Sequence, residues 1–144
     1  MNADEERPTV IIADDHAAIH PLLRRILEPE LNVIDGVFDG QALVDAVLRL
    51  HPDLIVVDVA MPVLDGIDAV KQLQAWRSGT AVVFISTDAA AENVARALRS
   101  GALAFVRKAS AAEQLLPAAR AALRGQRFVS GADESARFTM RTLR

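Results

Sequence analysis

The chain has 144 residues, of which 51% are hydrophobic and 24% charged, and its formal net charge is −3. This length suits one domain with one hydrophobic core, and the composition is that of a folded protein. The negative charge argues against a domain that grips nucleic acid with its whole surface. Because the sequence has no cysteine, disulfides, thiolate zinc sites and thiol nucleophiles are excluded.

The N-terminal segment gives no sign of export. Its first ten residues, MNADEERPTV, are acidic where a signal peptide is basic and then apolar. No apolar run approaches the roughly 18 residues that a membrane-spanning helix needs. A chain without disulfides also suits a reducing compartment. We therefore expect a cytoplasmic protein without a membrane segment.

Short apolar runs alternate with longer helical patterns, which predicts βα units around a parallel sheet. Several of the runs are nearly continuous in Val, Ile and Leu, as expected for strands that helices cover on both faces. The predicted strands are Thr9–Ala13, Leu31–Phe38, Leu54–Asp58, Ala81–Ser86 and Leu103–Val106.

Between and after these strands, apolar residues recur at helical spacing, so that each segment has one apolar face. The predicted helices are Ala17–Glu28, Gln41–Leu50, Ile67–Trp76, Glu92–Ser100 and Ala111–Leu123. Gly101 stands where a C-terminal glycine cap belongs, whereas Pro117 predicts a kink or a later start of the last helix. Beyond the last helix the pattern weakens, which predicts a domain over residues 1–125 and a linker-like tail over residues 126–144.

Polar side chains occur at the carboxyl ends of the predicted strands, where ligands bind in parallel α/β sheets. Asp14 and Asp15 follow the first strand, Asp58 ends the third, Ser86 ends the fourth, and Lys108 follows the fifth. Three neighbouring carboxylates repel one another unless a cation neutralises them. Magnesium suits such a cluster, because it takes carboxylate oxygens and keeps several waters.

An ionised Asp58 beside such a cation can attack phosphorus and form an acyl phosphate. Lys108 would neutralise the transferred group, and the Ser86 hydroxyl would donate a hydrogen bond to it. Taken singly, each residue has a simpler explanation, since an aspartate after a strand is usually a turn residue or helix cap and a single lysine is usually solvated. Only the joint pattern favours a site that accepts a phosphoryl group.

The motifs IIADDH, LIVVDVAMPVLDG, FIST and FVRKA resemble, in order and spacing, the receiver domain of bacterial two-component response regulators, the CheY-like superfamily. The resemblance implies a flavodoxin-like (βα)5 α/β fold, a doubly wound parallel sheet with strand order 2-1-3-4-5. The stretch RAALRGQRFVSGADESARF is similar to the connecting segment of the NarL/FixJ subfamily, whose members usually continue into a helix-turn-helix DNA-binding domain. None follows here, so we expect either a fragment of a longer regulator or a receiver with a tail.

The resemblance also implies the metal ligands. Asp58 would be the phosphoacceptor and a Mg2+ ligand, Asp15 a direct ligand, and Asp14 a ligand through water. The backbone carbonyl of Ala60 would be the remaining Mg2+ ligand that the protein supplies. Ala60 and Asp88 occupy the variable positions beside the site, so the lifetime of the phosphorylated state stays open.

Three further residues would bind the phosphate or report its presence. By resemblance, Lys108 would be the phosphate-binding lysine, while Ser86 and Phe105 would form the switch; a simpler role for Phe105 is core packing. The readout would change the surface made by the fourth helix, fifth strand and fifth helix, a face suited to a homodimer or output partner. The implied phosphodonor is a histidine kinase or a phosphotransfer protein.

Two other classes of protein remain open. A phosphoaspartyl phosphatase also uses magnesium and an aspartate nucleophile, but it needs a second acid where this chain has Ala60. A receiver-like interaction module independent of phosphorylation is disfavoured because the five polar site residues are all present. We therefore expect a signalling domain in transcription regulation and not an enzyme. Such a domain catalyses only its own phosphorylation and dephosphorylation. The i,i+4 pair His16 and His20 has the spacing of a metal-binding helix face, but no third ligand is evident.

Overall fold

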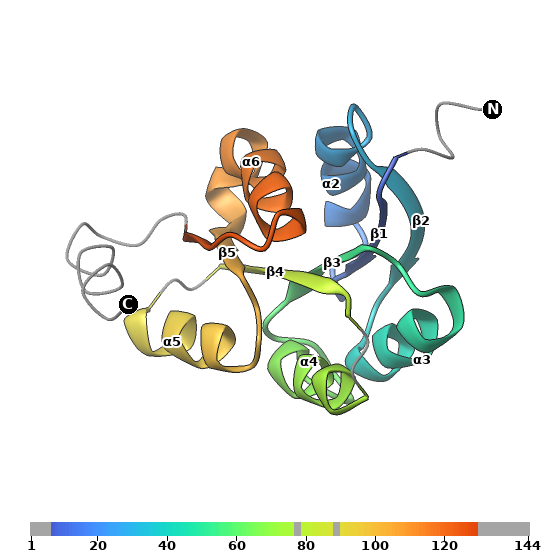
Figure 1. Cartoon of the computed structure of the whole chain (residues 1–144), viewed down its shortest axis with the longest axis vertical. Helices are drawn as coiled ribbons and strands as arrows, with labels where there is room; N and C mark the ends of the chain where they lie inside the picture. The colour runs from blue at the N-terminus through green and yellow to red at the C-terminus, as the bar shows by residue number, and fades with distance from the viewer. Residues whose placement is uncertain (1–6, 77–78, 88–89, 130–144) are drawn as a thin grey trace.

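The computed structural model describes residues 7–76, 79–87 and 90–129. All the predicted strands and helices are present, each within two residues of its predicted bounds (Figure 1). In chain order they are β1 (Thr9–Ala13), α2 (Ile19–Leu27), β2 (Asn32–Val37), α3 (Gly40–Leu50), β3 (Leu54–Asp58), α4 (Gly66–Ala75), β4 (Ala81–Ser86), α5 (Ala91–Arg99), β5 (Ala104–Arg107), a 3-10 turn (Lys108–Ser110), α6 (Ala111–Leu123) and β6 (Phe128–Val129).

The strands form one parallel sheet in the order β2-β1-β3-β4-β5-β6. This confirms the predicted 2-1-3-4-5 order and adds a sixth strand, β6, which was not predicted from the sequence. Phe128 and Val129 pair with Ala104 and Phe105 of β5. A two-residue strand is too short to have a period of its own, so its only signal is the Phe-Val pair. The rest of the predicted tail, residues 130–144, lies outside the described residues.

Helices cover both faces of the sheet, with α2 and α6 on one side and α3, α4 and α5 on the other (Figure 1). Alternate residues of each strand join opposite cores. In β1, Val10 and Ile12 pack in the core under α2 and α6, whereas Ile11 and Ala13 pack in the core under α3, α4 and α5. Each buried Val or Ile contributes about 1.5–3 kcal/mol, so strands apolar on both sides are favoured throughout.

Short-range signals set several helix ends. The Asp39 carboxylate accepts from the backbone N–H of Ala42 at 2.8 Å and so caps α3. Gly101 has φ +110°, a conformation that favours glycine, and confirms the predicted cap after α5. Helix α6 begins at Ala111 and runs through Pro117, so the later start that the proline suggested is wrong. Among the described residues, no helix has the length and apolar character needed to cross a membrane.

Candidate functional site

Four adjacent strands bring the predicted site residues to one edge of the sheet. Asp14 directly follows β1, Asp58 is the last residue of β3, Ser86 is the last of β4, and Lys108 directly follows β5. These strands are neighbours in the order β1-β3-β4-β5, and all run parallel. Residues far apart in sequence therefore converge at the carboxyl ends of the strands, where α/β sheets bind ligands.

Lys108 is the cation of the cluster. Its Nζ lies 2.8 Å from Oδ2 of Asp14 and 3.0 Å from Oδ2 of Asp58. The side chains of Asp14 and Asp58 are 0% and 5% exposed, and that of Lys108 is 11% exposed. One ammonium group is thus shared by two carboxylates in an almost dry environment, and the three groups together carry an excess negative charge.

The remaining carboxylate oxygens meet the loop residues that follow β1 and β3. Oδ1 of Asp14 accepts from the backbone N–H of His16 at 2.9 Å and lies 3.0 Å from its ring Nδ1. The same Nδ1 lies 3.3 Å from Oδ1 of Asp15, whose side chain is 34% exposed. Oδ1 of Asp58 accepts from the backbone N–H of Ala60 at 3.3 Å. The cluster is therefore open to solvent on its Asp15 side.

Burial and charge act in opposite directions on these groups. Burial raises the pKa of the Asp58 carboxyl, and the negative charge of Asp14 adds to this, so that hydrogen bonds from Lys108 and Ala60 do not bring it back to its ordinary value. Burial opposes ionisation of Asp14 too, but contacts with Lys108 and His16 outweigh it and lower its pKa. Burial would lower the pKa of Lys108, yet its two carboxylate partners raise it.

The residues present fit a magnesium ion. Ionisation of Asp58 is unfavourable, because its carboxylate is buried beside that of Asp14. A divalent cation next to the two carboxylates would offset this cost. One ligand atom from each of Asp14, Asp15, His16 and Asp58 lies within 4.8 Å of the others. Carboxylates with room for water on one side are the donors that Mg2+ prefers.

The loop after β3 is pressed against the acidic site. A side chain on Gly66 would place its Cβ only 2.1 Å from the backbone oxygen of Asp58, so only glycine fits there. The Gly66 N–H donates to the backbone oxygen of Val59 at 2.8 Å. This close approach fixes the backbone that carries Asp58 and Ala60.

The two predicted switch residues lie deeper in the fold. Ser86 is 7% exposed and pairs in register with Arg107, next to the strand that carries Asp58. Phe105 is 0% exposed and packs in the core on the side of α3, α4 and α5. Asp88, predicted to border the site, lies outside the described residues. His16 was not predicted as part of the site, although its place directly after Asp14 and Asp15 was a signal.

Comparison with known proteins agrees with this geometry. The chain matches the response regulator receiver domain family over residues 10–120. The chain belongs to this family. The receiver domain of a NarL response regulator from Mycobacterium tuberculosis superimposes with a TM-score of 0.80 at 27% identity, covering 84% of this chain and 99% of that one. The family and its flavodoxin-like fold, both expected from the motifs, are therefore confirmed.

Two curated relatives are longer than this receiver. It is 32% identical to the transcriptional regulatory protein LiaR of Bacillus subtilis over 81% of this chain and 56% of LiaR. It is 39% identical to a protein-glutamate methylesterase/protein-glutamine glutaminase of Colwellia psychrerythraea over 69% of this chain and 27% of that protein. The similarity to that protein thus spans about a quarter of its length, and the activity in its name is not carried over to this receiver.

Proposed function

We propose that this receiver is a phosphorylation-dependent switch of a two-component system in which Asp58 accepts a phosphoryl group from the phosphohistidine of a histidine kinase or phosphotransfer protein. The observation that carries the proposal is the contact of Lys108 Nζ with Asp58 Oδ2 at 3.0 Å, inside a buried cluster with excess negative charge. Carboxyl groups whose pKa is shifted by burial and by specific charged neighbours, as that of Asp58 is, are typical of reactive sites.

In the proposed site, the side chains of Asp15 and Asp58 and the backbone carbonyl of Ala60 would hold Mg2+, and Asp14 would act through a water. Asp15 is the exposed member of the group, which suits a ligand that meets an ion from solvent. When bound, the ion supplies positive charge that offsets the charge on the phosphoryl oxygens.

Asp58 reacts as a carboxylate. One of its oxygens forms a bond to phosphorus while the bond from phosphorus to the donor imidazole nitrogen breaks, and the imidazole leaves with the bonding electrons. Lys108 then moves its hydrogen bond from the carboxylate to a phosphoryl oxygen. The raised pKa of Lys108 keeps its ammonium group charged for this contact.

The proposed readout passes through Ser86 and Phe105. The Ser86 hydroxyl would donate to the phosphoryl group and draw the end of β4 towards Asp58. Because the Phe105 ring is already fully buried, phosphorylation would stabilise this inward position of the ring. The surface of α5, β5 and α6 would change with it and contact a second copy or an output partner.

The wider setting follows from the family. Receiver domains act in two-component signalling, which favours a cytoplasmic location and a role in transcription regulation, as in the LiaR relative. The proposed receiver unit spans residues 1–125 and the proposed connecting tail residues 126–144, although the first part of this tail already adds β6 to the edge of the receiver's sheet.

The test is covalent labelling of the purified chain. Incubation with acetyl phosphate and Mg2+ should add one phosphoryl mass to the wild type and none to Asp58→Ala. Asp45→Ala, which removes an exposed carboxylate of α3, is the matched control and should label like the wild type. Chelation of Mg2+ should prevent labelling. Equal labelling of Asp58→Ala and the wild type would overturn the proposal.

A further inference from the structure

His16 brings a nitrogen atom into a cluster that otherwise offers carboxylate oxygens. Its Nδ1 lies 3.0 Å from Oδ1 of Asp14 and 3.3 Å from Oδ1 of Asp15. It is also one of the four residues whose ligand atoms lie within 4.8 Å of one another, together with Asp58. The imidazole therefore faces the same point in space as the carboxylates.

His20, four residues further on, has a different role. Its side chain is buried, and its Nε2 lies 2.8 Å from the backbone oxygen of Asp14. Its ring packs against that of Phe38 with 4.6 Å between centroids and a tilt of 38°. Since a carbonyl oxygen only accepts, Nε2 of His20 carries the proton and holds the backbone after β1. The i,i+4 pair does not share a metal, and His16 alone faces the acidic cluster.

The hydrogen bonding of His16 can be exchanged for a metal bond. Carboxylate oxygens only accept, so Nδ1 carries a proton while it contacts Asp14 and Asp15. The His16 side chain is 67% exposed, so the proton can reside on Nε2 in water instead. In that tautomer the lone pair of Nδ1 faces the position of a cation. Oxygen donors suit Mg2+, whereas an added imidazole favours ions such as Ni2+ and Zn2+.

We propose that His16 makes this a mixed nitrogen and oxygen site, which binds imidazole-preferring divalent cations in competition with Mg2+. The inference rests on the proposed function, because it uses the same carboxylates of Asp15 and Asp58. An ion of this class would occupy the site through His16, Asp15 and Asp58, and its binding would exclude the Mg2+ that phosphoryl transfer requires. His16 thereby determines which metal the site selects.

The test compares Ni2+ with Mg2+ on protein that carries no polyhistidine tag, by titration calorimetry. Both ions favour six-coordinate geometry, so the ratio of their affinities isolates the preference for nitrogen. In His16→Ala the Ni2+-to-Mg2+ affinity ratio should fall roughly tenfold or more. His51→Asn is the matched control, since His51 is an exposed histidine with φ +48°, which asparagine tolerates, and its ratio should equal that of the wild type.

A second measurement uses the wild type alone. Zn2+ titration followed by 15N NMR of the imidazole rings should shift the Nδ1 resonance of His16 and leave that of His51 in place. An unchanged affinity ratio in His16→Ala, or an unmoved His16 resonance, overturns the inference. If Mg2+ binding still depends on Asp58, the proposed function survives that result; if Asp58→Ala binds Mg2+ like the wild type, the proposed function fails as well.

Discussion

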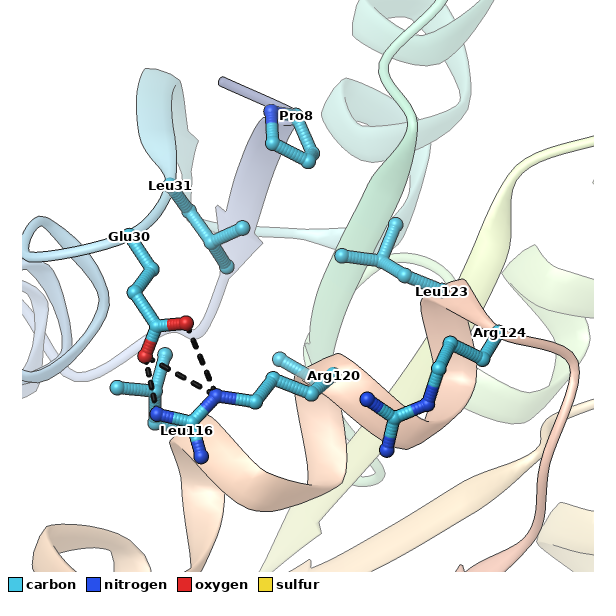
Figure 2. A pocket seen from close by; sticks show the side chains of 8 residues that line it. Pro8, Glu30, Leu31, Leu116, Arg120, Leu123 and Arg124 are labelled. Carbon is cyan, nitrogen blue, oxygen red and sulfur yellow. Dashed lines mark hydrogen bonds and ion pairs between the residues drawn. The ribbon is translucent and has the colours of Figure 1, made fainter.

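Two ion-paired regions of this receiver use the same kinds of group in different surroundings. At the carboxyl edge of the sheet, Lys108 lies between the buried carboxylates of Asp14 and Asp58. In the second region, beside α6, Glu30 and Arg120 line a cavity of about 280 Å³ (Figure 2). Nε of Arg120 donates to the two carboxylate oxygens of Glu30 at 2.9 and 3.0 Å, and its Nη2 also contacts Oε2.

Exposure and charge balance separate the two regions. The side chains of Arg120 and Glu30 are 46% and 42% exposed, and their charges cancel. The hydrogen bond from Arg120 lowers the pKa of the Glu30 carboxyl. By contrast, burial raises the pKa of the Asp58 carboxyl. Lys108 does not reverse this rise, because it is shared between two desolvated carboxylates. A balanced exposed pair is an ordinary surface contact, whereas an unbalanced buried cluster is unfavourable until a ligand completes it.

The largest expected effect is the removal of the buried cation. Lys108→Ala leaves Asp14 and Asp58 facing each other without a counter-charge, so the free energy of unfolding in EDTA should fall by about 3 kcal/mol. Urea denaturation measures the change, and saturating Mg2+ should restore much of it. Lys71→Ala, which removes an exposed lysine of α4, is the control. A loss no greater than in the control would mean that the carboxylates are solvated.

A smaller effect of opposite sign is expected at Asp58. Asp58→Asn keeps an oxygen acceptor but cannot ionise, and Lys108 remains paired with Asp14. At pH 7 in EDTA the free energy of unfolding should rise by on the order of 1 kcal/mol, because a buried like charge is removed. Urea denaturation checks this, with Asp45→Asn on the exposed face of α3 as the control. A lower stability would contradict the excess charge.

The pH dependence of the same variant sharpens the test. The pKa of Asp58 is raised above 3.8, so the folded wild type binds a proton more tightly than the unfolded chain. The stability that this proton contributes is present below the unfolded pKa and is lost as pH rises through the folded pKa. The advantage of Asp58→Asn over the wild type should therefore shrink as pH falls from 7 towards 4. If the difference in stability between Asp58→Asn and the wild type stayed constant over this pH range, it would arise from packing and not from charge.

The sequence predicted the acidic residues at the carboxyl edge of the sheet, but not the ion pairs that they or Glu30 make. Asp14 and Asp58 directly follow or end apolar strands, and parallel strands bring their carboxyl ends to one edge, so local pattern implies their proximity. The sharing of Lys108 between both carboxylates was not predictable, because it depends on the reach of a flexible side chain. The contact of Glu30 with Arg120 joins residues 90 positions apart and follows only from the packing of α6 beside α2. His16 was left out of the predicted site because it was considered only as a partner of His20, and no third ligand for that pair was evident from the sequence.

The smallest expected effect tests the exposed side of the comparison. Glu30→Gln removes the charge that pairs with Arg120 while keeping an oxygen acceptor, so stability should fall slightly or not at all. The measurement is urea denaturation at low salt and at about 1 M NaCl, where exposed charges are screened within roughly 3 Å. At high salt, the variant and the wild type should have the same free energy of unfolding. A loss that persists at high salt and rivals that of Lys108→Ala would mean that this pair is desolvated too. The distinction between the two regions would then rest on charge balance alone, since Glu30 and Arg120 would still neutralise each other where Asp14 and Asp58 compete for one lysine.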